Sequence, residues 1–178
     1  MGIATSQSKK YKVYTALLSQ NGTGNNPTTT TNGLLTVGVT YQITSYQSGD
    51  DFTNVGAINN NNGTYFVATG TTPRQWGSAS TLQYDTSAPF VNVFENTIGN
   101  ITWFYDGVGN YYCKLNGVFI NGKVFLNNQA LHINIGGPYL VVMERADNDT
   151  LYITTNLFGG SPTDSILINN PIEIRIYN

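Results

Sequence analysis

The carboxylates are the side chains of this chain with the most chemistry to offer, and they are few. Ten Asp and Glu residues stand against eight Lys and Arg and one His in 178 residues. Asp50 and Asp51 are adjacent, and Asp147 and Asp149 flank a single Asn. A pair of carboxylates brought together by the fold is the machinery of a glycosidase. An oxygen-rich turn is the donor set of a Ca²⁺ site.

Neither pattern is complete in the sequence. The Asp147-Asn148-Asp149 turn lacks the Gly and the distal Glu of an EF-hand loop, so we predict no metal site. Most carboxylates stand beside Gly or Asn, where Asp ordinarily accepts backbone N–H groups in turns. Asp50 and Asp51 are therefore interpreted as a structural turn, with a ligand or interface contact as the alternative. A glycan hydrolase remains open and requires two carboxyl groups within about 10 Å of each other.

The remaining reactive residue types form no catalytic pattern. His132 stands between Leu131 and Ile133, with no Cys or second His near it, and is predicted to be a surface or interface residue. Cys113 lies in an apparent strand and is predicted to be buried and inert. No G-x-S-x-G, P-loop or zinc pattern occurs. We predict a protein that is not an enzyme, with no catalytic residue and no cofactor.

The composition favours a binding or structural role. Only 10% of the residues are charged, against about 25% in an average globular protein, and 23 Asn and 23 Thr supply most of the polarity. The net charge of -2 gives no electrostatic reason to expect a nucleic acid or a membrane as a partner. No segment approaches the roughly 20 apolar residues of a membrane span.

Alternating polar and apolar residues predict strands throughout the chain. The first, 11–18, is expected to direct Tyr11, Val13, Thr15 and Leu17 inward. A second begins near residue 40, with Tyr41 and Ile43 on its buried side. From residue 90 on, the predicted strands are 90–94, 101–105, 111–115, 123–126, 131–135, 139–144, 150–155, 165–168 and 172–177.

Turn signals separate nearly all of these strands. Asp106-Gly107, Asn116-Gly117 and Asn121-Gly122 are typical of type I′ hairpins, although the last two are too close together for both to be tight. Short strands at this spacing predict an all-β fold, an antiparallel β-sandwich that is jelly-roll-like, with an inserted small β subdomain.

Two polar stretches, 19–33 and 84–89, are predicted to be exposed loops or linkers. These stretches divide the chain, and we predict three parts: an N-terminal arm over 1–10, a sandwich core from 11–24 plus 88–178, and an inserted β module over 34–83.

Residues 38–82 carry the most sharply patterned wording of the chain. They include YQITSYQSGDDFTNVGA from Tyr41 and FVATGTTPRQW from Phe66. This wording resembles a small module that recurs in virion structural proteins of tailed bacteriophages. Arg74 and the run of four Asn before Gly63 are the departures from the common form, and they leave the frame intact.

A second resemblance covers the flanking segments. YKVYTALLSQNGTG from Tyr11 and APFVNVFENTIGNITW from Ala88 are similar to structural proteins of phages of Bacteroidetes, including crAss-like phages. There the first strand runs almost directly into the Ala-Pro segment, so the resemblance implies that the 38–82 module is inserted.

The resemblances imply a virion location on the capsid surface. The expected function is that of an auxiliary capsid, decoration or head-fibre subunit, with the major capsid protein or other virion proteins as partners and a homo-oligomer, a trimer, as its assembly. The alternative is a tail-fibre or spike domain that binds a host surface glycan. Possible interaction residues are Asp50, Asp51, Arg74 and Trp76. Lys9 and Lys10 belong to the arm that is expected to dock onto the virion.

Overall fold

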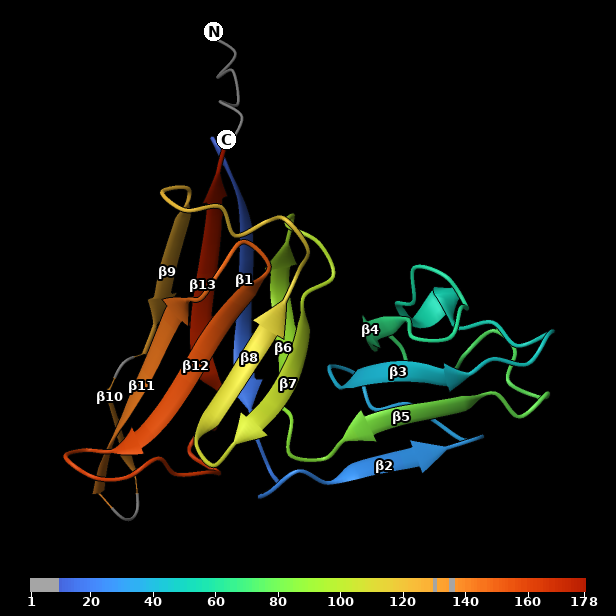
Figure 1. The fold of residues 1–178 in the computed structure, drawn as a ribbon, viewed down its shortest axis with the longest axis horizontal. Coiled ribbons are helices and arrows are strands. Elements are labelled where there is room, and N and C mark those ends of the chain that lie inside the picture. Colours follow the sequence, from blue (N-terminus) through green and yellow to red (C-terminus); the bar gives the residue numbers. More distant parts are fainter. Residues whose placement is uncertain (1–9, 130, 135–136) are drawn as a thin grey trace, which may run out of the picture.

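The computed structural model describes residues 10–129, 131–134 and 137–178. Within them the chain is all-β, as predicted, with strands that pair only in antiparallel fashion and one short 3₁₀ helix, η1 (Thr53–Val55). Figure 1 shows two bodies side by side, a larger one built from two sheets and a smaller one built from a third. None of the described residues forms a helix long and apolar enough to span a membrane.

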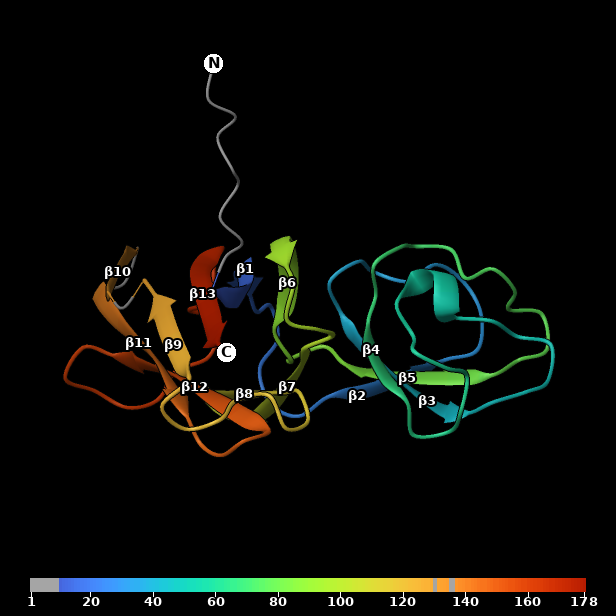
Figure 2. The same cartoon turned by 90° about the horizontal axis from the view of Figure 1, so that it is seen from above.

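The larger body is a sandwich of two sheets, which Figure 2 shows as two layers. One sheet has the order β6-β1-β13-β9 and is built from β1 (Tyr11–Ser19), β6 (Phe90–Asn96), β9 (Val124–Asn128) and β13 (Asn170–Tyr177). The other has the order β10-β11-β12-β8-β7 and is built from β7 (Thr102–Gly107), β8 (Asn110–Lys114), β10 (Leu131–Asn134), β11 (Gly137–Arg145) and β12 (Thr150–Leu157). The predicted antiparallel β-sandwich is confirmed, and the jelly-roll-like connectivity stays a prediction.

The core of the sandwich lies between its two sheets. Its largest fully buried side chains are Trp103, Tyr14, Tyr111 and Phe119, and aliphatic side chains from both sheets fill the space around them. Full burial of each large apolar side chain contributes roughly 1.5–3 kcal/mol. Cys113 is buried in this core, as predicted, and burial raises the pKa of its thiol.

The predicted inward face of β1 is wrong. The sandwich core receives Tyr14, Ala16 and Leu18, and the predicted set lies outside it, although Val13 of that set is also buried. Both faces of this strand carry apolar residues, so the alternation of β1 alone does not select one. The neighbour β13 decides it, because Ala16 lies opposite the buried Ile172 and directly opposed residues of an antiparallel pair point to the same side of the sheet.

Three further expectations about local structure are wrong. Residues 84–89 were predicted to be an exposed loop or linker, but the first two of them end the strand β5 (Thr81–Asp85). Pro27–Thr30, predicted to be part of an exposed loop, forms the short strand β2 at the edge of the third sheet. Residues 165–168, predicted to be a strand, form none. Ile166 and Leu167 are buried there in irregular backbone, which the Gln20 N–H secures by donating to the Leu167 carbonyl at 2.8 Å.

The two Asn-Gly dipeptides after β8 form no tight hairpin. Both lie in the connection from β8 to β9, and those strands belong to different sheets. The hairpin between β7 and β8 does form, but Gly107 pairs with Asn110, so Val108 and Gly109 make its turn in place of Asp106-Gly107.

The third sheet lies within the connection between β1 and β6. Those two strands are hydrogen-bonded neighbours, yet the chain between them builds a sheet of order β2-β5-β3-β4 from β2, β3 (Thr40–Ser45), β4 (Tyr65–Val67) and β5 (Thr81–Asp85). We call residues 27–85 the module. The predicted burial of Tyr41 and Ile43 is confirmed, and they join Phe52, Phe66 and Leu82 in a core separate from that of the sandwich.

Candidate functional site

Asp50 ties two loops of the module together. Its side chain is only 2% exposed, and its carboxylate accepts N–H groups from Gly77 at 2.8 Å, Ser78 at 2.9 Å and Ser80 at 2.9 Å. Burial by itself would raise the pKa of Asp50, but the bonds from Ser78, Ser80 and Gly77 outweigh it, and the pKa lies below its ordinary value. The residue is a buried anionic cap for the loop after Trp76.

Asp51 performs a similar task on the surface. Its Oδ1 accepts from the Thr53 hydroxyl at 2.7 Å and the Thr53 N–H at 2.9 Å, which forms a local turn that leads into η1. Its Oδ2 pairs with Nη1 of Arg74 at 2.7 Å. The two Thr53 bonds are the main reason that the pKa of Asp51 falls to about 2, and the charge of Arg74 adds less.

Trp76 and Asn54 complete the connection between the two loops. The indole N–H of Trp76 donates to the Ser80 carbonyl at 2.8 Å, and its ring packs edge-on against Phe52. The amide of Asn54 donates to the Thr72 carbonyl at 3.0 Å and accepts the Arg74 N–H at 2.7 Å. The structure therefore brings the four predicted interaction residues into one neighbourhood, where each has a partner inside the fold. Their role in contacts with another molecule stays a prediction.

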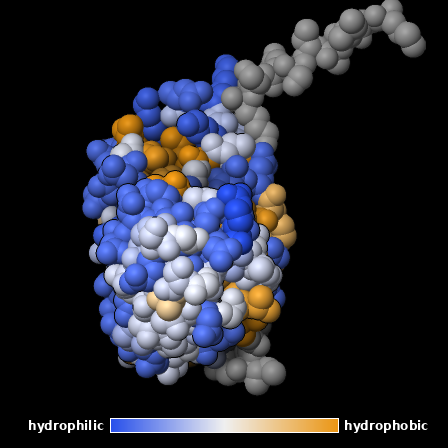
Figure 3. All heavy atoms as spheres, turned by 90° about the vertical axis from the view of Figure 1, so that its right-hand side faces the viewer, coloured by the Kyte–Doolittle hydropathy of each residue, from blue (hydrophilic) through white to orange (hydrophobic). Residues whose placement is uncertain are grey.

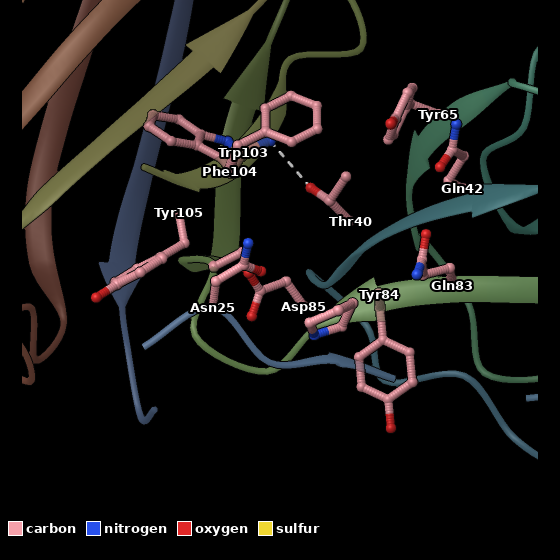
Figure 4. A pocket seen from close by; sticks show the side chains of 12 residues that line it. Asn25, Thr40, Gln42, Tyr65, Gln83, Tyr84, Asp85, Trp103, Phe104 and Tyr105 are labelled. Atoms are coloured by element: carbon pink, nitrogen blue, oxygen red, sulfur yellow. Dashed lines mark hydrogen bonds between the residues drawn. The ribbon is translucent and has the colours of Figure 1, made fainter. Parts of the chain in front are cut away.

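A groove of about 350 Å³ separates the module from the sandwich. Its lining combines aromatic rings, amides and one carboxylate, and Figure 4 shows it from close by; the lining residues are Asn25, Pro27, Thr40, Gln42, Tyr65, Gln83, Tyr84, Asp85, Ala88, Trp103, Phe104 and Tyr105. A volume of this size is at the lower end of the roughly 300–1,000 Å³ found for small-molecule sites. We take this groove as the candidate functional site.

Strand register explains how the module forms its wall of the groove. Tyr65 of β4 lies opposite Gln42 of β3, and Gln42 lies opposite Gln83 of β5. Directly opposed residues of an antiparallel sheet share a face, with Cβ atoms about 5 Å apart. A ring and two amides therefore form one row on the face opposite to the module core.

The sandwich supplies the other wall from β7. Phe104 meets Tyr65 edge-on, with ring centroids 5.2 Å apart, and stacks on Tyr112 of β8 at 4.9 Å. Tyr112 in turn meets Tyr152 of β12 at 6.2 Å. A continuous row of four rings thus leads from the groove across the outward face of the sandwich.

Short contacts hold the two walls at this spacing. The backbone N–H of Trp103 donates to the Thr40 hydroxyl at 2.9 Å, as the dashed line in Figure 4 marks. The Val91 N–H donates to the Gly38 carbonyl at 3.0 Å. Tyr105 also fixes the segment that leads into the module, because its hydroxyl accepts the Gly24 N–H at 3.2 Å and donates to Asp164 at 3.0 Å.

The groove contains one carboxylate among its lining residues, Asp85. Its Oδ1 accepts N–H groups from Ser87 at 2.8 Å and Asn26 at 3.2 Å. A glycosidase needs two carboxyl groups about the scissile bond, so this lining does not supply the pair that hydrolysis would require. Among the residues that the structure describes, no Lys, Arg or His lines the groove.

The other residues singled out in the sequence lie elsewhere. Asp149 accepts the Gly117 N–H at 2.6 Å, and Asp147 accepts the Asp149 N–H at 2.8 Å, so both act as turn caps. Within the described ranges, no three His, Cys, Asp or Glu side chains gather closely enough to hold a metal ion. His132 lies on β10 opposite Tyr139, and its side-chain surroundings lie outside the described part.

The arm falls almost entirely outside the described residues. Lys9 belongs to the part that the structure does not describe, and Lys10 is exposed at the start of β1. The docking role of Lys9 and Lys10 stays a prediction.

Sequence reasoning did not select the groove residues. Gln42 was assigned only to the outward side of a strand and Phe104 only to a strand, and no strand was predicted at Gln83, which lies in β5. Alternation marks Gln42 as outward-facing, but no local signal shows that two outward faces from different bodies oppose each other. Comparisons of this chain with protein-family models, with curated proteins and with solved structures find no match.

Proposed function

We propose that this protein is a non-enzymatic structural protein of a tailed-phage virion, an auxiliary subunit bound to the capsid surface as a decoration or head-fibre protein. The observation that supports this proposal is the structural role of the patterned Gly-Asp-Asp-Phe segment, residues 49–52. Asp50 and Asp51 are committed to N–H groups of their own module, which suits a portable scaffold. The surfaces left for contacts are poor in charge and rich in aromatic and amide groups.

Attachment to the shell and to further copies then depends on apolar and hydrogen-bonded surfaces. The major capsid protein or another virion protein is the proposed partner, and a homo-oligomer, a trimer, is the proposed assembly. Figure 3 shows the end of the molecule formed by the module, where the surface is mainly hydrophilic with separate hydrophobic patches. An end of this kind suits exposure to solvent at the outside of a particle.

Labelled virions test the proposal directly. We expect an antibody fragment or a gold label on this protein to decorate the heads of purified particles in electron micrographs. Deletion of residues 1–10 is expected to lower the occupancy on those heads. Particles that carry the label nowhere would refute the virion role, and undiminished occupancy after the deletion would refute the docking arm.

A tail-fibre or spike domain that binds a host glycan is the second candidate. The aromatic and amide lining of the groove favours it. In the same experiment this function places the label at the tail tip, so the position of the label separates the two candidates.

A further inference from the structure

We propose that the groove between the module and the sandwich binds a neutral saccharide. Gln42 and Gln83 would hydrogen-bond its hydroxyl groups, and Tyr65 and Phe104 would pack against its apolar face. This inference rests on the second candidate function proposed above and deepens it, because it names the ligand class and the residues that would bind it.

The two glutamines carry the argument for a polyhydroxylated ligand. Within the described residues, neither side-chain amide has a hydrogen-bond partner, although both line the groove and are half-buried. Each amide offers two donors and one acceptor. Because Gln42 of β3 lies directly opposite Gln83 of β5, the Cβ atoms of the two residues are about 5 Å apart. A sugar presents neighbouring hydroxyl groups, each both donor and acceptor, which match such a pair.

The rings supply the apolar contact. Tyr65 is 43% exposed, and Figure 4 shows its ring between that of Phe104 and the amide of Gln42. One face of a pyranose ring carries mainly C–H groups, which pack favourably on an aromatic surface. Tyr112 and Tyr152 continue the row beyond the groove. The row therefore offers contacts to further units of an oligosaccharide.

Charge selects a neutral ligand. In the described part of the chain no cationic side chain lines the groove, so a phosphate or carboxylate would lose its hydration without a charged partner. Asp85 adds a fixed negative charge, and its Oδ2 accepts no hydrogen bond from the described residues. That oxygen is available to a ligand hydroxyl. A proline-rich peptide also docks on aromatic rings, but it would leave the donors and acceptors of the two amides only partly used.

The test is a titration of the isotope-labelled full chain followed by NMR. The probes are cellotetraose, chitotetraose, a mannose tetrasaccharide, and galactose-terminated and fucose-terminated oligosaccharides, with a proline decapeptide as the competing class. We expect at least one saccharide to shift the signals of the Gln42 and Gln83 side-chain amides and of the Tyr65 backbone. Replacement of both glutamines by Ala is expected to weaken that binding by about tenfold or more.

Matched variants keep the result interpretable. Gln47→Ala removes an exposed glutamine from the same module, away from the groove, and is expected to leave the affinity unchanged. Tyr65→Ala removes the ring contact and is expected to weaken binding while the module signals stay dispersed. The proposal is overturned if no saccharide shifts the groove signals, if only the peptide does, or if Gln47→Ala weakens binding as much as the double variant. A titration without saccharide binding would leave the result of the labelled-virion experiment unchanged. Virions without label would likewise leave the result of the titration unchanged.

Discussion

Asp50 illustrates how one carboxylate can organise a loop that has little apolar surface of its own. Residues 77–80 contribute only polar and small side chains, so packing cannot define their path. Three N–H groups of this loop converge on the carboxylate at 2.8–2.9 Å. Hydrogen bonds to a charged acceptor are roughly twice as strong as those between neutral groups. The loop after Trp76 is therefore positioned by hydrogen bonds to a charged carboxylate.

Replacement of Asp50 by Asn is predicted to destabilise the protein by about 2–4 kcal/mol, because an amide cannot accept all three N–H groups and a donor is left unsatisfied. The free energy of unfolding from urea denaturation, followed by tryptophan fluorescence, measures the loss. Asp106→Asn is the matched control, since Asp106 is exposed and has no hydrogen-bond partner among the described residues. A loss no larger than that of the control would show that the three bonds contribute little.

The lowered pKa values of Asp50 and Asp51 predict a loss of stability in acid. A carboxyl with a lower pKa in the folded state stabilises the protein above its unfolded pKa, near 3.8, and this stabilisation disappears as the pH falls through the folded value. The free energy of unfolding should therefore fall as the pH drops from about 4 to about 2.

Amide NMR signals report the two groups separately. The Thr53 N–H is expected to titrate with a midpoint of about 2, and the Ser78 and Ser80 N–H groups with a midpoint below 3.8. Midpoints at or above 3.8 for both sets of signals would contradict the hydrogen-bonded arrangement.

At the scale of elements, the β1–β6 pair shows how the module is accommodated. The two strands keep their direct pairing although a whole sheet lies between them in sequence. The two ends of the insertion run side by side, since the Thr86 N–H donates to the Asn26 carbonyl at 3.4 Å and β2 pairs with β5. Because both ends leave from one place, the insertion adds its own core while β1 and β6 stay paired.

Gly38 is the tightest point of this junction. Its φ of +86° disfavours other residues, and a Cβ there would lie 2.1 Å from the Val91 carbonyl oxygen. Gly38→Ala is predicted to cost about 3 kcal/mol or more, of which roughly 1 kcal/mol is backbone strain. The remainder arises because the module must move away from β6.

Gly33→Ala is the control for Gly38→Ala. Gly33 has a φ of +102° and no atom within 4 Å of the added Cβ, so the free-energy cost of this variant is backbone strain alone. Urea denaturation of both variants gives the steric contribution as their difference. Equal losses would show that the contact with β6 contributes nothing.

At the scale of the whole molecule, the outward face of the β6-β1-β13-β9 sheet combines a hollow with exposed aromatic side chains. A hollow of about 440 Å³ crosses it, between Phe94 on β6 and Asn127 on β9. Phe94 is 64% exposed, at the β-bulge where β6 loses register with β1. Arg175 lies over the rings of Tyr11 and Phe125 on the same sheet. Exposed aromatic side chains on a sheet face are typical of the centre of an interface.

If the protein self-associates through this face, Phe94→Ser is predicted to shift the molecular mass in solution toward that of the monomer. Multi-angle light scattering after size exclusion measures the mass. Phe158→Ser is the matched control, because Phe158 is 69% exposed but follows β12 of the opposite sheet. A wild-type protein that is monomeric at high concentration, or equal effects of the two variants, would exclude this interface.

The strands of the fold were predictable because alternation is a local property. Most strands from β6 to β13 begin and end within a few residues of the predicted bounds. Segment 165–168 was mistaken for a strand because a short run of buried apolar residues is also typical of a strand. In the structure its backbone is irregular, and the Leu167 carbonyl accepts the Gln20 N–H from another segment. β2 was missed because a short edge strand of Pro and Thr needs hydrogen bonds from only one neighbour and no apolar face.

By itself, the sequence determined the all-β class, most strand positions from residue 90 on and the buried face of β3, since each follows from residues a few positions apart. Only the tertiary structure decided the inward face of β1, the partners of Asp50 and the groove. Each of these depends on pairing between segments far apart in the chain: Ala16 with Ile172, Asp50 with Ser80, and Thr40 with Trp103. Periodicity reports which side chains are outward, but only the packing of two bodies turns outward side chains into the walls of a site.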